Sequence, residues 1–292
     1  MLAQLFAVMA PVLIGAGLGF TWVRLGHDFP VPFVTKLVFN IGTPALILAS
    51  LSGAEVDAQS FTLTMLGTLL VLAVMAMATL LVAPLLGKPW QVLLSPMMYP
   101  NTGNMGLPVV LYAFGPSAFA FAVAVMVTVS LVQFTFGIAM SSRSGRPLRT
   151  LARTPALYAI AIALTLLLTD TDLPLWLDNT LELISGFTVP LMLITLGVSL
   201  ANIRVSNLAA GLGFSVMRIP LAALLAFGIG HLLALPPLAQ SILVVQMSMP
   251  VAVFNYLFAQ RSGREPEYVA SLVFCSTLLA FLYLPALLAF LL

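Results

Sequence analysis

Charge is scarce in this sequence. Only 7% of the 292 residues are Asp, Glu, Lys or Arg, and 61% are hydrophobic, whereas soluble domains carry about 25% charged residues. The net charge of +2 is too small to indicate a basic surface for nucleic acid. The composition therefore predicts an integral membrane protein that contacts lipid, and it excludes nucleic acid as a partner.

The sequence also lacks the side-chain patterns of most catalytic and metal sites. Its one cysteine, Cys275, can form neither an internal disulfide nor a cysteine metal cluster. The two histidines, His27 and His231, form no HExxH spacing, and there is no Gly-Lys-Ser/Thr phosphate loop and no Gly-x-Ser-x-Gly elbow. We therefore expect no enzyme activity, no metal site and no cofactor.

Acidic residues are missing from the interior of the long apolar runs. All of them lie in polar segments or at the ends of runs: Asp28, Glu55, Asp57, Asp170, Asp172, Asp178, Glu182, Glu265 and Glu267. A sodium/proton antiporter needs a membrane-buried carboxylate to exchange protons for cations. The sequence therefore argues against that mechanism.

What the sequence has instead is a series of apolar runs separated by short polar segments. A transmembrane helix needs roughly 20 apolar residues, and shorter runs can be accommodated by tilt or bilayer thinning. The fold class we expect is an all-α integral membrane protein with ten transmembrane helices. The expected spans are residues 2–22, 32–52, 61–86, 90–114, 117–140, 155–169, 179–201, 207–233, 238–260 and 268–291.

The basic residues indicate how these spans are oriented. Ten of the 11 Lys and Arg residues lie in or beside the first, third, fifth, seventh and ninth connecting loops, and none lies in an even-numbered loop. Positive residues near span ends are retained in the cytoplasm. We therefore expect the odd-numbered loops to be cytoplasmic and both termini to lie outside, in a bacterial-type inner membrane.

The fourth span is interrupted near its middle. Residues 99–108 contain Pro100, Pro108 and two glycines, which are incompatible with a continuous helix. Unwound backbone at membrane depth is tolerated only where it is buried in protein or lines a polar cavity. We expect Asn104 or a neighbour to cap the second half-helix, whose free N–H groups and positive dipole end favour an anion. An ordinary turn between two helices is the alternative.

The two halves of the sequence resemble each other. Each half has five expected spans, an odd number, so the halves are expected to be inverted relative to each other, as in many secondary transporters. We place the first repeat at residues 1–140, a cytoplasmic basic linker at 141–154 and the second repeat at 155–292. Prolines recur at similar offsets: Pro11 with Pro155, Pro44 with Pro190, Pro100 with Pro250 and Pro116 with Pro266.

The repeat predicts a second break, in the ninth span. Residues 246–255 contain Pro250, with Ser248 ahead of it as an expected helix cap. A simple kink at Pro250 is the alternative. Paired interrupted spans in corresponding positions indicate a binding site near the membrane midplane. The polar residues nearest the two breaks are Asn40, Thr43, Asn101, Asn104, Gln246, Ser248 and Asn255.

Arg218 is a basic residue inside a span. It lies about ten residues into the eighth span, or roughly 15 Å deep at 1.5 Å per residue. Burying a cation in the membrane is costly, so an intramembrane arginine is a functional-site hypothesis. Three roles remain open: binding a substrate carboxylate, binding backbone carbonyls at a break, or placing a fixed positive charge where a coupling sodium ion would sit.

The sequence NTGNMGLP at residues 101–108 resembles the fourth-span signature of the auxin efflux carrier family, which includes plant PIN-type carriers and bacterial organic-acid transporters. The sequence GTP at residues 42–44 and Pro250 support the resemblance. It implies a ten-span fold of two inverted repeats, similar to that of bile-acid/sodium symporters, with a scaffold domain and a transport domain. It also implies that four residues lie near the substrate: Asn101, Asn104, Pro108 and Pro250. Gly103, inside the same motif, is a further candidate for substrate binding.

Together these features predict a secondary carrier that moves a small organic anion, such as malonate, malate or an auxin-like acid, by alternating access. Arg218 and the amide groups of the broken helices would form the anion site. Two alternatives remain: a sodium-coupled symporter, in which Asn and Thr oxygens hold the ion, and a non-transporting membrane sensor with the same pocket. The expected partners are the anion, membrane lipid and a coupling sodium ion or proton, and a homodimer is left open.

Overall fold

The computed structural model describes residues 2–52, 57–133, 135, 155–169, 171, 173–203 and 205–292. Predictions for the basic linker at 141–154, and for Glu55, Asp170 and Asp172, lie outside the described residues. The described chain is all-helical, apart from an isolated β-bridge and the connecting segments. The expected all-α class is confirmed.

The helices follow the expected spans closely, with the predicted spans 155–169 and 207–233 matched to within one residue at each end. Two segments, η1 and η2, are π-helical. The elements are α1 (Leu2–Arg24), α2 (Val31–Leu37), η1 (Val38–Gly42), α3 (Thr43–Ser52), α4 (Ala58–Leu85), α5 (Trp90–Met98), η2 (Thr102–Gly106), α6 (Leu107–Phe114), α7 (Pro116–Val132), α10 (Pro155–Thr169), α11 (Leu175–Gly186), α12 (Thr188–Asn202), α13 (Leu208–Leu232), α14 (Pro237–Ser248), α15 (Phe254–Ser262) and α16 (Pro266–Leu291).

Within the described residues, six stretches are long and apolar enough to cross a bilayer: Phe6–Arg24, Val31–Ser50, Ala58–Leu85, Leu175–Asn202, Leu208–Leu232 and Pro266–Leu291. α7 is apolar but shorter, and the expected fourth and ninth spans are each divided into short helices. Large apolar side chains such as Leu81, Leu224 and Leu282 are exposed on the outside of the molecule. This pattern fits a multi-pass membrane protein, because lipid replaces water around these side chains.

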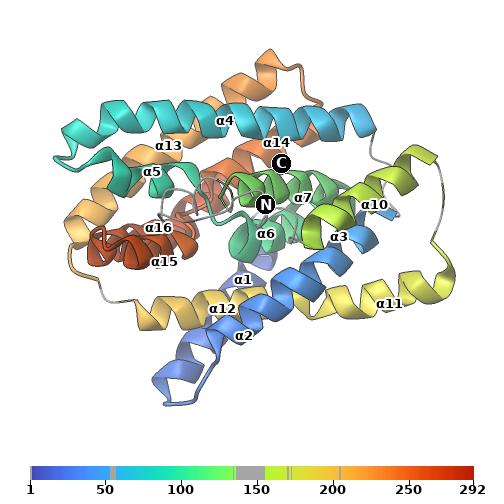
Figure 1. Cartoon of the computed structure of the whole chain (residues 1–292), viewed down its shortest axis with the longest axis horizontal. Helices are drawn as coiled ribbons and strands as arrows, with labels where there is room; N and C mark the ends of the chain where they lie inside the picture. The colour runs from blue at the N-terminus through green and yellow to red at the C-terminus, as the bar shows by residue number, and fades with distance from the viewer. Residues whose placement is uncertain are drawn as a thin grey trace.

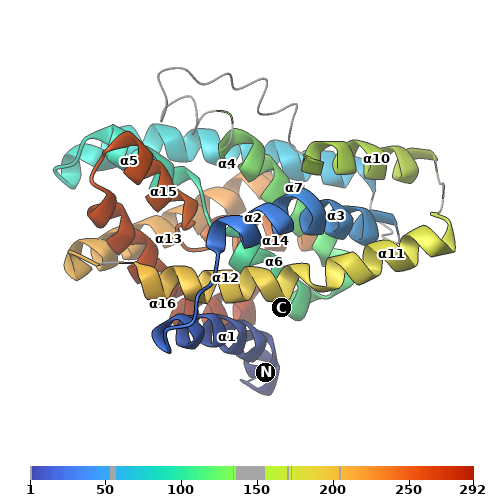
Figure 2. The ribbon, with the colours of Figure 1, turned by 60° about the horizontal axis from the view of Figure 1, so that its bottom comes forward.

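The helices form two bundles. In the first, which we call the flanking bundle, α1 and α2 pack on α12, and α3 packs on α10 and α11. In the second, the core bundle, α4 packs on α5, α7 and α13, while α16 packs on α13 and α15. Figures 1 and 2 show α4 on the opposite side of the molecule from α1, α2 and α12.

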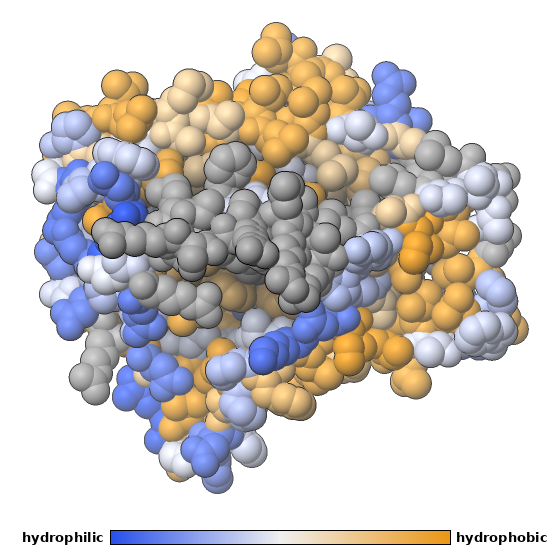
Figure 3. All heavy atoms as spheres, viewed as in Figure 1, coloured by the Kyte–Doolittle hydropathy of each residue, from blue (hydrophilic) through white to orange (hydrophobic). Residues whose placement is uncertain are grey.

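Three connecting loops meet at one end of the core bundle. Lys88 Nζ, in the loop between α4 and α5, lies 2.5 Å from Glu265 Oε2, in the loop between α15 and α16. The loop before α13 joins them, because the N–H groups of Ser206 and Asn207 each donate to Ser271 Oγ at 3.1 Å. Figure 3 shows strongly hydrophilic residues at the left margin, the side on which Figure 1 places α5, α15 and α16. The third, seventh and ninth loops therefore share one face, which we call the odd-loop face.

The start of α4 gives a pH-dependent prediction. Asp57 accepts hydrogen bonds from Ser60 N at 2.9 Å and Ser60 Oγ at 3.0 Å, and these bonds lower the pKa of its carboxyl. A carboxyl whose pKa is lower in the folded protein than in the unfolded chain stabilises the folded state. This stabilisation is fully present above the unfolded pKa of about 3.9, and it is lost as pH falls through the folded-state pKa. Asp57→Ala should therefore lower the Tm more at pH 7 than below pH 3 in a thermal unfolding assay. Equal shifts at both pH values would contradict this role.

Candidate functional site

Both expected breaks are present. α5 ends at Met98, and residues 99–101 are non-helical before η2 begins. α14 ends at Ser248, and residues 249–253 are non-helical before α15 begins. The second break is therefore more than a kink at Pro250, because five residues leave the helix.

The two breaks cross and pair with each other. Pro100 and Val251 form an antiparallel β-bridge. The N–H of Asn101 donates to the carbonyl of Pro250 at 2.7 Å. Such bonds satisfy backbone groups that lost their helical partners, which is essential at membrane depth. The crossing is thus a short two-stranded contact between the fourth and ninth expected spans.

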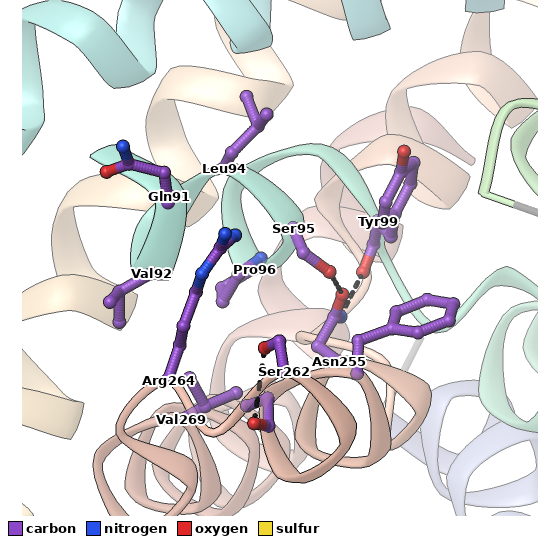
Figure 4. A pocket seen from close by; sticks show the side chains of 12 residues that line it. Gln91, Val92, Leu94, Ser95, Pro96, Tyr99, Asn255, Ser262, Arg264 and Val269 are labelled. Atoms are coloured by element: carbon purple, nitrogen blue, oxygen red, sulfur yellow. Dashed lines mark hydrogen bonds between the residues drawn. The ribbon is translucent and has the colours of Figure 1, made fainter. Parts of the chain in front are cut away.

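Asn255 reinforces this crossing from the second residue of α15. Its Nδ2 atom donates to Tyr99 O at 3.0 Å and to Ala252 O at 2.9 Å. The hydroxyl of Ser95 donates to Asn255 Oδ1, and Figure 4 shows the bonds of Asn255 with Ser95 and Tyr99. The Ala252 N–H also donates to Tyr99 O, at 3.1 Å. The start of α15 is therefore fixed to the end of α5.

Arg218 binds both broken helices. Its side chain is fully buried, and it donates from Nε to Pro96 O at 3.0 Å and from Nη1 to Met249 O at 2.8 Å. In a continuous helix Pro96 O would accept from residue 100, but Pro100 has no N–H. Arg218 lines neither of the two cavities described below. Its geometry matches the second of the three open roles, binding carbonyls at the breaks; the substrate-binding role and the role as a fixed positive charge stay predictions.

The helix caps differ from the prediction. Asn104 lies inside η2, and the residue before α6 is Gly106, which provides no side-chain cap. The hydroxyl of Ser248 donates back to Val244 O at 2.6 Å instead of capping a following helix. Both cap predictions are wrong because the chain leaves each break through extended or π-helical backbone. Pro108 lies in the first turn of α6, as expected.

A cavity lies beside the crossing, between the two bundles; together with the open space at its mouth it measures about 570 Å³, of which about 60 Å³ is accessible to the centre of a water molecule. The core bundle contributes the broken segments, α7 and the start of α15, and the flanking bundle contributes α2, η1 and α12. The part of α12 that lines the cavity adjoins the loop before α13, so the cavity lies toward the odd-loop face. The polar lining residues are Thr35, Asn101, Thr102, Asn104, Ser130, Gln133, Thr195 and Ser199. We call this space the crossing cavity.

Three buried polar atoms of the crossing cavity have no hydrogen-bond partner within the described residues: Asn101 Nδ2, Gln133 Nε2 and Thr195 Oγ1. Their residues are only 5%, 5% and 7% exposed. Buried polar groups are normally hydrogen-bonded, and an unpartnered one costs about 1–3 kcal/mol. Two of the atoms are amide donors, on Asn101 and Gln133 of the core bundle. The third is the hydroxyl oxygen of Thr195, on α12 of the flanking bundle. The set indicates a site for a ligand rich in hydrogen-bond acceptors.

Two helix N-termini add positive potential to the crossing cavity. Thr102, the first residue of η2, and Val253, the residue before α15, both line it. Helix N-termini carry free N–H groups and a positive dipole end, which favour anions. No Asp or Glu is among the described residues that line the cavity. Together with the amide donors, this electrostatic environment suits a small anion.

The structure brings some of the predicted site residues together and separates others. Asn101, Gly103 and Asn104 line the crossing cavity. Asn40 is exposed in η1, and Thr43 is buried with an unpartnered hydroxyl, but neither lines this cavity.

The sequence analysis missed several cavity residues, of which Gln133 and Thr195 matter most. A lone amide in the expected fifth span was a signal for Gln133, because an unpartnered amide is costly in hydrocarbon. Thr195 and Ser199 are four residues apart, so they share one face of α12. That spacing alone does not predict that this face of α12 lines a cavity.

Comparison with known proteins identifies the family. Residues 142–288, just over half of the chain, match the family described as membrane transport protein. An uncharacterized transporter of Methanothermobacter thermautotrophicus is 28% identical over 271 residues, which cover 86% of each chain. An uncharacterized transporter of Methanocaldococcus jannaschii is 27% identical over 192 residues, 62% of this chain and 61% of the relative. With its apolar spans and crossed broken helices, the chain belongs to the membrane transport protein family, the auxin efflux carrier type of membrane transporter.

Proposed function

We propose that the protein is a secondary carrier that moves a small organic anion across a bacterial-type inner membrane by alternating access. The observation that carries the proposal is the crossing cavity with its three unpartnered buried polar atoms. A carboxylate, as in malonate, malate or an auxin-like acid, would accept hydrogen bonds from the amides of Asn101 and Gln133. Thr195 would reach the same anion from the flanking bundle, so the ligand would bridge the two bundles.

The proposed architecture is ten spans in two inverted repeats, residues 1–140 and 155–292. Corresponding contacts in the two halves support it. α4 packs on α5 and α7 in the first half, as α13 packs on α14 and α16 in the second. α6 packs on α7 as α15 packs on α16, and α1 packs on α12 as α10 packs on α3. Repeats with an odd number of spans must be inverted, and a site between them suits alternating access.

The proposed cycle moves the core bundle against the flanking bundle. The crossing cavity lies toward the odd-loop face, which the distribution of Lys and Arg predicts to be cytoplasmic. On the other side of the crossing, α6 packs against α1 and α12. Separation of α6 from these two helices would open the site to the outside, where both termini are proposed to lie.

We further propose that transport does not require sodium. Two carbonyl oxygens at the breaks, which could otherwise face a cation, accept from the guanidinium of Arg218. Oxygens of Asn255 and Tyr99 at the crossing are also hydrogen-bonded within the protein. Arg218 would thus supply a fixed positive charge in place of a coupling ion, and voltage or a pH gradient would drive the anion.

Asn101→Ala tests the site. It should slow uptake of the transported acid into proteoliposomes by about tenfold or more, because a buried hydrogen bond to a charged group contributes roughly 1.5–3 kcal/mol. Gln133→Leu should have a similar effect. Asn179→Ala removes an exposed amide of α11 and is the matched control, with uptake at the wild-type rate. Uptake by both cavity variants within twofold of wild type would contradict the proposed site.

A further inference from the structure

A second cavity lies within the core bundle. It is lined by residues of α5 and α15, the turn after α15 and the first part of α16. Together with the open space at its mouth it measures about 450 Å³, of which about 30 Å³ is accessible to the centre of a water molecule. It shares no lining residue with the crossing cavity. Figure 4 shows it from close by. We call it the Arg264 cavity, after the one charged residue among the described residues that line it.

Arg264 points into this cavity. Figure 4 shows its side chain extending from the turn between α15 and α16 toward α5. The residue is half-buried, and within the described chain its side chain has neither an ion-pair partner nor a hydrogen bond. A guanidinium group in a half-buried position normally gains an anionic or carbonyl partner, since desolvating a charge is unfavourable. The position of Arg264 therefore favours an anionic ligand.

The backbone of the turn holds Arg264 in this orientation. Gly263 ends α15 with a φ of +66°, and Glu265 also adopts a left-handed conformation, with φ 44° and ψ 55°. A left-handed conformation is unfavourable for a residue with a Cβ. The Arg264 N–H donates to Ala259 O at 3.0 Å, and Glu265 turns away to pair with Lys88 at 2.5 Å. The neighbouring acid is therefore engaged elsewhere, and the charge of Arg264 is left uncompensated.

The rest of the cavity offers neutral polar groups. Gln91, Ser95, Asn255 and Ser262 line it, and no Asp or Glu is among its described lining residues. Ser95, Asn255 and Ser262 already donate hydrogen bonds within the protein, so Gln91 and Arg264 are the lining residues with donors for an anion. Guanidinium groups bind carboxylates and phosphates through two parallel hydrogen bonds. We propose that the Arg264 cavity binds a small oxyanion, at a site separate from the crossing cavity. Free phosphate, a free carboxylate and the phosphate of an anionic lipid headgroup share this chemistry.

An anion bound in the Arg264 cavity would affect the crossing of the two broken helices through α5. Ser95 of its lining bonds to Asn255, and the carbonyl of Pro96 accepts from Arg218. An anion held between α5 and the turn after α15 would therefore stabilise the contact between the two broken helices. Because a ligand that binds the folded protein raises its stability, phosphate should raise the Tm.

The experiment is a titration of the purified full chain with inorganic phosphate and with malonate, followed by calorimetry and by the Tm. We expect saturable binding to wild type. Arg264→Gln should raise the Kd by about tenfold or more, because it removes a charged hydrogen-bond donor. The Kd of Arg264→Lys should lie between those of wild type and Arg264→Gln. Arg24→Gln, at an exposed arginine ending α1, is the matched control and should bind as wild type does.

Two further experiments distinguish the Arg264 cavity from the crossing cavity, and the free ion from the lipid headgroup. Gln133→Leu changes the crossing cavity and should keep the phosphate binding that depends on Arg264, even if transport fails. Weaker phosphate binding in phosphatidylglycerol nanodiscs than in phosphatidylcholine nanodiscs would identify the lipid headgroup as the bound oxyanion, and equal binding would identify the free ion. The proposal is overturned if wild type shows no saturable binding in phosphatidylcholine nanodiscs, or if Arg264→Gln binds within twofold of wild type.

Discussion

Arg218→Ala is expected to abolish transport and to lower the free energy of unfolding by roughly 2–6 kcal/mol. The substitution leaves two buried carbonyls, Pro96 O and Met249 O, without their donors, and each unsatisfied group costs about 1–3 kcal/mol. Both carbonyls belong to the crossing that positions Asn101 in the cavity. Thermal unfolding in detergent and uptake into proteoliposomes measure the two effects.

Arg218→Lys tests whether the stability lost in Arg218→Ala comes from the missing hydrogen bonds to the two carbonyls. Lysine keeps the positive charge and can donate to a carbonyl, although its ammonium lacks the planar fork of arginine. We therefore expect it to recover part of the stability lost in Arg218→Ala. Arg24→Ala removes an exposed arginine and should leave the Tm and uptake unchanged. A wild-type Tm and a wild-type uptake rate in Arg218→Ala would contradict the role given to this residue.

Gly197→Ala is expected to destabilise the flanking bundle by about 3 kcal/mol, at the upper end of the usual range for overpacking. A Cβ on Gly197 would lie 1.8 Å from the carbonyl oxygen of Ala16, in the helix α1. Gly19 makes a similar close approach, because its Cβ would lie 2.0 Å from Ile194 O. Small residues permit this packing in membranes, and backbone atoms cannot move aside as a flexible side chain can. The Tm and the yield of folded protein measure the loss.

Gly17→Ala is the matched control for this substitution. Gly17 also lies in α1, but a Cβ there would meet no atom within 4 Å. Its Tm should stay within a few degrees of wild type. If Gly17→Ala and Gly197→Ala lowered the Tm equally, the loss would come from the glycine backbone and not from the contact between α1 and α12.

The sequence was sufficient to predict the all-helical class and the position of both breaks. Proline and glycine act locally, since a missing N–H or a missing Cβ disrupts a helix wherever it lies. That is why Pro100 and the glycines near it marked the first break. The similarity of the two halves then placed the second break at Pro250. The inverted repeat and its boundaries remain predictions.

The details of the site could not be predicted in the same way, because they depend on distant packing. Nothing near Gln133 or Thr195 in the sequence shows that both residues line the same cavity as Asn101. The expected cap at Ser248 was wrong because the chain after it runs extended to pair with Pro100, which is a tertiary contact. For Arg218, the depth of the charge could be predicted from its position in the eighth span, but its partners could not.

The most direct test of the central claim is uptake of labelled malonate, malate and indole-3-acetate into proteoliposomes that contain the wild-type protein. Each acid is tested with and without sodium, and under an imposed voltage or pH gradient. We predict that at least one acid is taken up, that voltage or a pH gradient drives it, and that sodium makes no difference. Strict dependence on sodium would contradict the role of Arg218 in place of a coupling ion, and no uptake of any acid would contradict the anion carrier itself.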